Sequence, residues 1–248
     1  MANKATRPYD SVSLIYNELM KEVNYDLWSK YILDIVQENL DTHFPSVLEL
    51  GAGNCRMANA ISAKYPDYIA SDLSFAMLQQ NDNASLSKIC CDMTHLPFSN
   101  KFDLIISAFD SVNYLLTKKQ LLKLFYQIRN ILSETGIFTF DVSLEKNSLG
   151  FKDSYSSKSE TNGYRYERKS KYNPKTRIHK NTFKITDKNG DVTREIHKQK
   201  IFKFNSYFSL IEKAGLFVVE CLDAFTFNNG NPNCERVQFI LKIDRSKC

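Results

Sequence analysis

The sequence has few of the residues that staple a chain together or anchor a metal. Six cysteines are spread over 248 residues without a Cys-x-x-Cys pair or a nearby histidine cluster. That spacing excludes the disulfide framework of a small secreted domain and lacks the paired ligands of a zinc site, so we expect no metal. We interpret the adjacent Cys90 and Cys91 as two small strand residues on opposite faces of a sheet.

Long hydrophobic runs are also missing. The longest, such as residues 104–106, have the length of a strand and fall far short of the roughly 18 apolar residues of a membrane span. Residues 1–8 are polar and contain no apolar signal core. We therefore expect a cytoplasmic protein with no membrane partner. A chain of 248 residues, 43% hydrophobic and 25% charged, suffices for one large domain or for a domain with an insertion.

Charge of one sign is concentrated in one segment. Residues 152–203 contain fifteen Lys or Arg and six Asp or Glu, a net charge of +9 in a chain whose total is +5, so the remainder carries −4. This distribution indicates a local role, such as contact with phosphate groups, or simply a solvated sheet face.

The apolar periodicity changes along the chain. Residues 9–42 show helical spacing, and residues 47–142 alternate strand-like runs with helical ones. We predict strands at 47–50, 68–71, 88–91, 102–108 and 137–142, and helices at 56–64, after an N-cap at Ser74, and at 121–132. This order is typical of a parallel sheet covered by helices on both faces.

Residues 152–203 show polar–apolar alternation instead. The runs 163–172, 177–186 and 192–204 are separated by turn sequences at 173–175 and 187–190, which predicts a three-stranded antiparallel insertion. A helix at 206–214 and strands at 217–224 and 236–243 are then expected to complete the main sheet.

The glycine loop after the first predicted strand is the clearest functional signal. Glu49, Leu50, Gly51, Ala52 and Gly53 form an acidic strand end followed by a Gly-x-Gly turn, where backbone can approach a ligand closely. Asp72 ends the next strand, 21 residues after Gly51, where a carboxylate can accept both hydroxyls of a ribose. Together they indicate a cofactor that contains adenosine.

The same loop argues against a dinucleotide. The third glycine of Gly-x-Gly-x-x-Gly is replaced by Arg56, which disfavours close packing of a pyrophosphate at the helix start. Glu49 would repel a pyrophosphate but suits an ammonium or a sulfonium.

Four segments in order resemble the motifs of class I methyltransferases that depend on S-adenosylmethionine (SAM). Residues 49–53 look like motif I, 71–78 like the motif with the ribose-binding acid, 91–98 like the adenine-binding motif, and 102–110 like motif IV. The resemblance implies an α/β fold: a Rossmann-like, doubly wound, seven-stranded, mostly parallel sheet with an antiparallel β insertion after strand five. It also implies SAM as the cofactor and S-adenosylhomocysteine as its product.

Further segments resemble a bacterial small-molecule branch of these enzymes, which includes amino-sugar N,N-dimethyltransferases. They are residues 15–20 with Tyr25 and Trp28, residues 110–115, and residues 224–227. This resemblance implies a helical lid at 1–45, a SAM-binding core at 46–150, a substrate cap formed by the insertion at 151–204, and completion of the core sheet at 205–248.

The resemblance also implies site residues. The cofactor-binding set is Tyr16, Trp28, Glu49, Gly51, Ala52, Gly53, Asp72, Leu73, Met77, Asp92, Met93, Ala108 and Phe109, and the catalytic set is Asp110, Asn113 and Tyr114. Tyr16 and Trp28 can also be core aromatics. Residues 109–113 lie just past the fourth strand, where reacting groups gather in such sheets. The isolated His95, His179 and His197 are expected to be structural or solvated.

We therefore expect methyl transfer by in-line displacement to a nitrogen or oxygen atom of a small polar acceptor. The basic insertion suits a phosphorylated or nucleotide-linked acceptor, and the sequence leaves the oligomeric state open, a dimer included. The alternatives are an RNA methyltransferase that uses the insertion and a non-catalytic SAM-binding protein. Nucleic acid is disfavoured because the sequence of residues 108–111 is Ala-Phe-Asp-Ser, not the Asn-Pro-Pro-Tyr type that methylates amino groups of bases.

Overall fold

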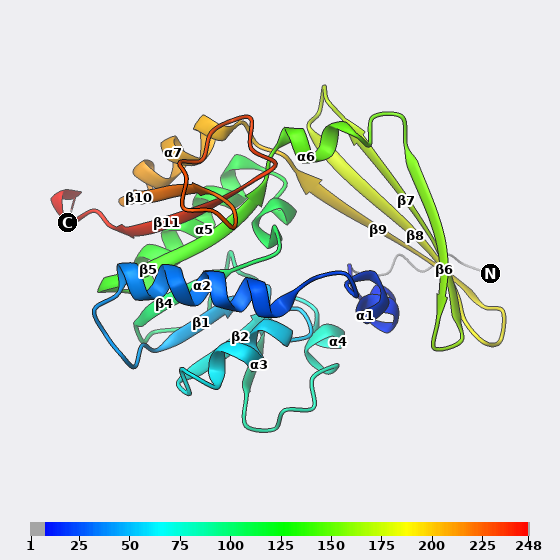
Figure 1. Cartoon of the computed structure of the whole chain (residues 1–248), viewed down its shortest axis with the longest axis horizontal. Helices are drawn as coiled ribbons and strands as arrows, with labels where there is room; N and C mark the ends of the chain where they lie inside the picture. The colour runs from blue at the N-terminus through cyan, green and yellow to red at the C-terminus, as the bar shows by residue number, and fades with distance from the viewer. Residues whose placement is uncertain (1–7, 248) are drawn as a thin grey trace.

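Alternating strands and helices build a central sheet with two covered faces (Figure 1). The computed structural model describes residues 8–247, and within them the larger sheet has seven strands in the order β10-β11-β5-β4-β1-β2-β3. Its strands are β1 (Val47–Leu50), β2 (Tyr68–Asp72), β3 (Ser87–Cys90), β4 (Phe102–Ser107), β5 (Leu132–Ser143), β10 (Leu216–Asp223) and β11 (Arg236–Ile243). The first five pair in parallel, and β11 is antiparallel to both β5 and β10.

The helices bury apolar stripes against the two faces of this sheet. On one face α2 (Tyr25–Asn39) and α3 (Arg56–Ser62) pack on β1, β2 and β4, and on the other α5 (Lys118–Ile131) and α7 (Phe204–Lys213) pack on β5 and β11. Local signals fix where helices begin: Asn24 caps α2, and Thr117 and Gln120 form a capping box at α5. The shorter helices are η1 (Val12–Ile15), α1 (Tyr16–Leu19), α4 (Phe75–Leu78), η2 (Ser111–Tyr114), α6 (Glu145–Leu149) and η3 (Arg245–Lys247).

The insertion forms a separate antiparallel sheet that projects beside the core (Figure 1). Its strands, in spatial order, are β6 (Tyr155–Thr161), β7 (Tyr164–Asn173), β8 (Ile178–Thr186) and β9 (Val192–Lys200). One face is buried, because Tyr166, Phe183 and Ile185 pack against Val12 and Ile15 of the N-terminal segment. The N-terminal segment therefore joins the insertion to the core.

The predicted fold class is confirmed, with one correction in the insertion. The insertion contains four strands within the described residues and not the expected three; β6 is the strand that the sequence pattern did not predict. The sequence of β6, Tyr-Ser-Ser-Lys-Ser-Glu-Thr, carries no alternating apolar residues, and most of it is exposed. An edge strand that buries neither face has no period-two signal to find.

Other expectations concern cysteines, membrane spans and chain ends. The five cysteines in the described part of the chain are free thiols, with Cys90 exposed and Cys91 half-buried. None of the helices between residues 8 and 247 has the length and apolarity to cross a bilayer. Residues 1–7 of the expected N-terminal lid, and Cys248, lie outside the described residues.

Candidate active site

A cavity of about 260 Å³ lies at the carboxyl ends of β1, β2 and β4, where loops and the N-terminal segment meet. Ligand sites of open α/β sheets form at this edge. Ten residues of the predicted cofactor set line it: Tyr16, Gly51, Ala52, Gly53, Asp72, Leu73, Met77, Asp92, Met93 and Phe109. Five segments that are separate in the sequence are thus brought to one cavity.

The glycine loop that follows β1 needs both of its glycines. Gly51 has a φ of +70° and Gly53 a φ of +57°, which is left-handed backbone. A Cβ on Gly51 would lie 2.7 Å from the Ser111 Oγ, and one on Gly53 would lie 3.3 Å from the Met77 Cε. A side chain at position 51 would collide with Ser111, and one at position 53 would crowd Met77 and strain the backbone, so the backbone itself forms the floor.

Asp72 is held in the cavity by backbone amides. The Gly53 N–H donates to its Oδ2 at 2.8 Å, and the Ser74 N–H donates to its Oδ1 at 2.7 Å. Burial raises the pKa of this carboxyl group, while the amide hydrogen bonds act in the opposite direction. Each oxygen has accepting capacity left for a ligand hydroxyl.

Asp92 forms a tight turn after β3. Its Oδ1 accepts from the Thr94 N–H at 2.7 Å and from the Thr94 hydroxyl at 2.9 Å. Burial would raise the pKa of Asp92, but the hydrogen bonds from Thr94 and His95 outweigh burial and hold the pKa below its usual range. The carboxylate is therefore ionised and presents its second oxygen as an acceptor at the cavity wall.

Three residues of the predicted cofactor set do not line the cavity. Glu49 is buried within β1, and its Oε2 accepts from the Tyr68 hydroxyl at 2.8 Å. Trp28 packs behind Phe109 with ring centroids 4.5 Å apart, and Ala108 is buried at the end of β4. These residues form the layer beneath the cavity, a position that does not favour direct contact with a cofactor.

The predicted catalytic residues are divided among different environments. Tyr114 lines the cavity. Asp110 does not: its Oδ1 accepts from Arg236 Nη2 at 2.7 Å and its Oδ2 from Gln199 Nε2. It therefore joins β9 and β11 to the loop after β4.

Asn113 is wholly buried and bonded to backbone. Its Nδ2 donates to the carbonyl oxygens of Lys200 at 2.9 Å and Ser143 at 3.3 Å, and the Ser143 N–H donates to its Oδ1 at 3.0 Å. A side chain with no exposed surface and all its groups engaged cannot orient an acceptor. The structure instead gives Asn113 the role of a clamp between η2, β5 and β9.

Other polar side chains beside the cavity were not predicted as site residues. Tyr9 lines the cavity next to Tyr114, and His197, expected to be structural or solvated, lies within hydrogen-bond distance of Tyr114. Glu195 is bonded to His197. The sequence did hold a signal for this pair, since residues 195 and 197 of a strand share a face.

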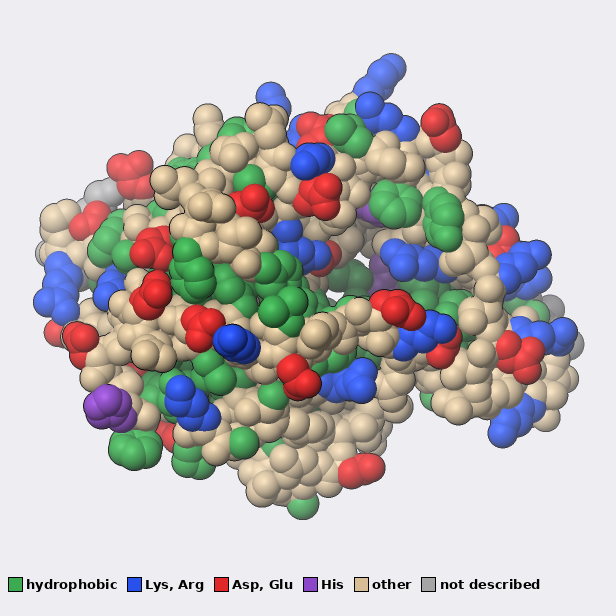
Figure 2. All heavy atoms as spheres, in the orientation of Figure 1, with side chains coloured by type: hydrophobic (Ala, Val, Ile, Leu, Met, Phe, Trp, Pro, Cys, Tyr) green, Lys and Arg blue, Asp and Glu red, His purple; other side chains and the backbone are tan. Residues whose placement is uncertain are grey.

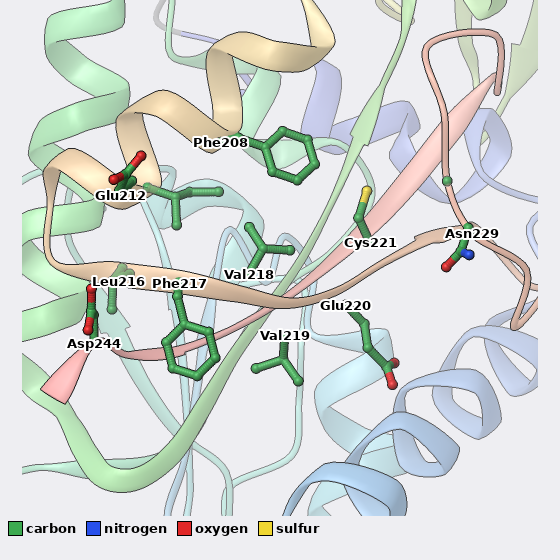
Figure 3. Close-up of a pocket in the computed structure, with 12 residues that line it drawn as sticks. Phe208, Glu212, Leu216, Phe217, Val218, Val219, Glu220, Cys221, Asn229 and Asp244 are labelled. Atoms are coloured by element: carbon green, nitrogen blue, oxygen red, sulfur yellow. The ribbon is translucent and has the colours of Figure 1, made fainter. Parts of the chain in front are cut away.

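A second hollow of about 690 Å³ lies at the far edge of the main sheet (Figure 3). Phe208 of α7 faces Val218 and Cys221 of β10 there. β10 is four strands away from β1, so this hollow contains none of the motif residues. Among the described residues no group of three or more His, Cys, Asp or Glu is arranged to hold a metal ion.

Comparison with known proteins decides the class of this site. A family profile described as "Methyltransferase domain" matches residues 47–136, the segment that forms the cavity floor. A provisionally named methyltransferase of Geobacillus sp. (strain WCH70) is 27% identical over 244 residues, covering 94% of this chain and 99% of the relative. The protein is a SAM-dependent methyltransferase. The two sequences align over nearly all of their given lengths, so the match includes the insertion.

Solved structures share the fold of this methyltransferase. A SAM-dependent methyltransferase from Clostridium acetobutylicum ATCC 824 has a TM-score of 0.80 and 22% identity, with 96% of this chain and 99% of that chain covered. The sugar N-methyltransferase KedS8 from Streptoalloteichus sp. ATCC 53650 has a TM-score of 0.75 and 16% identity, with 98% and 99% covered. At these identities the likeness concerns the fold.

Proposed function

We propose that this methyltransferase holds SAM in the cavity described above and methylates a nitrogen or oxygen atom of a small polar acceptor. The observation that carries the proposal is Asp72, a half-buried carboxylate fixed by two backbone amides at the cavity wall. Its remaining accepting capacity suits the two hydroxyls of a ribose. The bare backbone of Gly51 and Gly53 leaves room for the rest of the cofactor.

The remaining wall suits an adenosine sulfonium. Asp92 offers an acceptor oxygen for an exocyclic amino group, and Met93 and Phe109 supply apolar surface beside it. Tyr16 and Met77 close the side near Gly53. Glu49 and Trp28 would act through the residues that they support, because neither lines the cavity.

SAM supplies an electrophilic methyl group, which the acceptor's lone pair takes as the bond between methyl carbon and sulfur breaks and its electron pair stays on sulfur. The chain's part is to align the acceptor and to exclude water. Tyr9 and Tyr114 line the cavity with their hydroxyl oxygens 2.7 Å apart, and Tyr114 reaches His197 of the insertion. A polyhydroxylated or aminated acceptor suits this wall, and the fold shared with a sugar N-methyltransferase supports the same class.

The cofactor assignment is tested by calorimetry on the full-length protein. Wild type should bind SAM and S-adenosylhomocysteine. Asp72→Asn should weaken both at least tenfold, since hydrogen bonds to a charged group contribute about 1.5–3 kcal/mol. Asp67→Asn, at an exposed position before β2, is the matched control and should bind like wild type. An equal loss in both variants, or no binding by wild type, would contradict the assignment.

The acceptor is tested by release of S-adenosylhomocysteine. Matched amino and hydroxy sugars, each free and nucleotide-linked, should include a substrate, and the better member of a pair separates N- from O-methylation. Turnover of RNA alone would favour the RNA alternative. Normal SAM affinity with no turnover of any probe would favour a non-catalytic protein.

A further inference from the structure

Four side chains form one hydrogen-bonded chain at the edge of the cavity. The Tyr9 and Tyr114 hydroxyl oxygens are 2.7 Å apart, the Tyr114 hydroxyl is 2.9 Å from His197 Nδ1, and His197 Nε2 is 2.6 Å from Glu195 Oε1. Both tyrosines line the cavity, whereas His197 and Glu195 are buried behind them. The chain therefore leads from the cavity to a buried carboxyl group.

The direction of donation follows from the last member of the chain. Burial would raise the pKa of Glu195, but hydrogen bonds from His197 and from the Ser11 and Tyr9 amides outweigh burial and lower it. An ionised Glu195 only accepts, so His197 Nε2 carries a proton, and in the neutral form of the ring that tautomer leaves Nδ1 bare. Nδ1 then accepts from Tyr114, whose oxygen accepts from Tyr9.

Tyr9 is left with an oxygen that can accept from a ligand. A hydroxyl has one proton and two lone pairs, and the proton of Tyr9 is directed to Tyr114. Burial raises the pKa of both phenols, which keeps them neutral and able to pass a proton on.

The N-terminal segment holds Tyr9 in this position at a cost. Tyr9 has a φ of +69°, a left-handed conformation that is unfavourable for a bulky residue. Its N–H donates to Glu195, the carboxylate that also accepts from His197, and the ring packs edge-on at 4.5 Å from the imidazole. The Glu195 carboxylate thus holds both Tyr9 and His197 in place.

We propose that Tyr9, Tyr114, His197 and Glu195 form a proton relay that deprotonates the methyl acceptor. The acceptor's ammonium or hydroxyl proton passes to the Tyr9 oxygen, the Tyr9 proton to Tyr114, and the Tyr114 proton to His197 Nδ1. The imidazolium is paired with Glu195, and the acceptor keeps the lone pair that it needs. After product leaves, the proton returns to solvent through the same phenols. This relay rests on the proposed function, with Tyr9 touching the acceptor and His197 and Glu195 acting through it.

A pH dependence follows from this arrangement. Protonation of His197 at low pH fills Nδ1 and blocks the relay, so turnover falls on the acid side. The titratable and charged groups around the relay come from several elements. They are Glu195 on β9, Arg168 on β7, Tyr9 and Tyr16 on the N-terminal segment, Asp72 at the end of β2, Asp110 before η2, and Tyr114 in η2.

The first test reads the histidine itself. Long-range ¹H–¹⁵N NMR of the full-length protein with SAM should show His197 protonated on Nε2 and bare on Nδ1, and Tyr114→Phe should perturb the Nδ1 signal. This readout needs no acceptor. A proton on Nδ1 of the neutral ring would reverse the donor direction and overturn the relay.

The second test is the pH profile of turnover on the amino and hydroxy sugar probes. His197→Asn, Tyr114→Phe and Tyr9→Phe should lower turnover about 100-fold or more, with SAM affinity unchanged by calorimetry. His197→Asn should also abolish the acid limb. His179→Asn alters another buried histidine, on β8 and bonded to Ser148, and should leave the profile unchanged.

The outcomes separate the relay from the proposed function. Failure of wild type to bind SAM sinks the proposed function. If wild type binds SAM and turns over a probe, but His197→Asn keeps the acid limb, only the relay is contradicted. The four residues then have a structural role. If none of the sugar probes is turned over, the His197 tautomer decides the relay by itself.

Discussion

Glu49 shows how strongly one buried carboxyl group can respond to its surroundings. Burial raises its pKa from 4.5 to about 7, and only the hydrogen bond from Tyr68 opposes the shift. A raised pKa in the folded state means that the folded chain binds more protons than the unfolded chain between these values. The stability contribution is therefore complete below about pH 4.5 and is lost as pH rises through about 7.

Glu49→Gln should remove this pH dependence. The glutamine oxygen can still accept from Tyr68, so the change deletes the titration and keeps the hydrogen bond. Urea unfolding at pH 5 to 8 should show wild type losing about 2–3 kcal/mol relative to the variant as pH rises. If the free energy of unfolding of wild type and variant changes equally with pH, Glu49 does not titrate in this range. A loss of SAM affinity would place Glu49 near the cofactor's ammonium, as the sequence suggested.

The residues that the sequence identified share one property: they follow strands of the parallel core. Gly51 follows β1, Asp72 is the last residue of β2, and Asp92 lies two residues past β3. Parallel strands bring such residues to one edge of the sheet. The partners from other elements could not be placed in this way. Arg236 meets Asp110 because β11 inserts between β5 and β10, and that strand order is absent from local patterns.

The 3-10 helix η2 is the element that links core and insertion. Its Asn113 bonds to the backbone of β5 at Ser143 and to Lys200 at the end of β9. A buried polar group that loses its partner costs about 1–3 kcal/mol. We therefore expect this amide to help fix the position of the insertion over the cavity.

Asn113→Ala should lower the free energy of unfolding by about 2 kcal/mol and speed hydrogen exchange at the Ser143 amide, which loses its acceptor. Asn113→Asp keeps that acceptor and should retain slower exchange there than the alanine variant. Asn233→Ala, at an exposed loop position, is the control and should match wild type. A raised KM for the acceptor with unchanged stability and exchange would instead support the catalytic role predicted for Asn113.

The insertion shows what alternation can and cannot predict. In β9 the polar Glu195 and His197 are buried, whereas the apolar Ile196 between them is exposed. Alternation therefore predicts the strand, but it does not predict which face is buried. The alternation does not say what the buried face meets. Only the register places His197 opposite Asn181, and only the tertiary fold brings Tyr114 to its ring.

At the scale of the whole molecule, a row of three lysines and the cavity lie on different faces of the insertion. Lys171, Lys180 and Lys198 are exposed and directly opposite one another on β7, β8 and β9. They alternate with the residues that pack toward Tyr9 and the core. Figure 2 shows Lys and Arg side chains spread over the outside of the insertion. A phosphate backbone bound to that outer face would lie away from the site of methyl transfer.

Lys180→Glu tests this separation. Reversing the central charge replaces two repulsive cross-strand pairs with attractive ones, so the free energy of unfolding should rise by about 0.2–1 kcal/mol. SAM affinity and turnover of a small acceptor should not change, because the side chain faces away from the cavity. Lys180→Gln, which removes the charge without reversing it, should give a smaller gain in stability and the same turnover.

An RNA substrate held by the outer face predicts the opposite: turnover that falls in both variants, more in Lys180→Glu, and a weaker salt dependence of RNA binding. Measuring unfolding, SAM binding and RNA binding at two salt concentrations on these two proteins therefore separates a solvated face from a nucleic-acid surface.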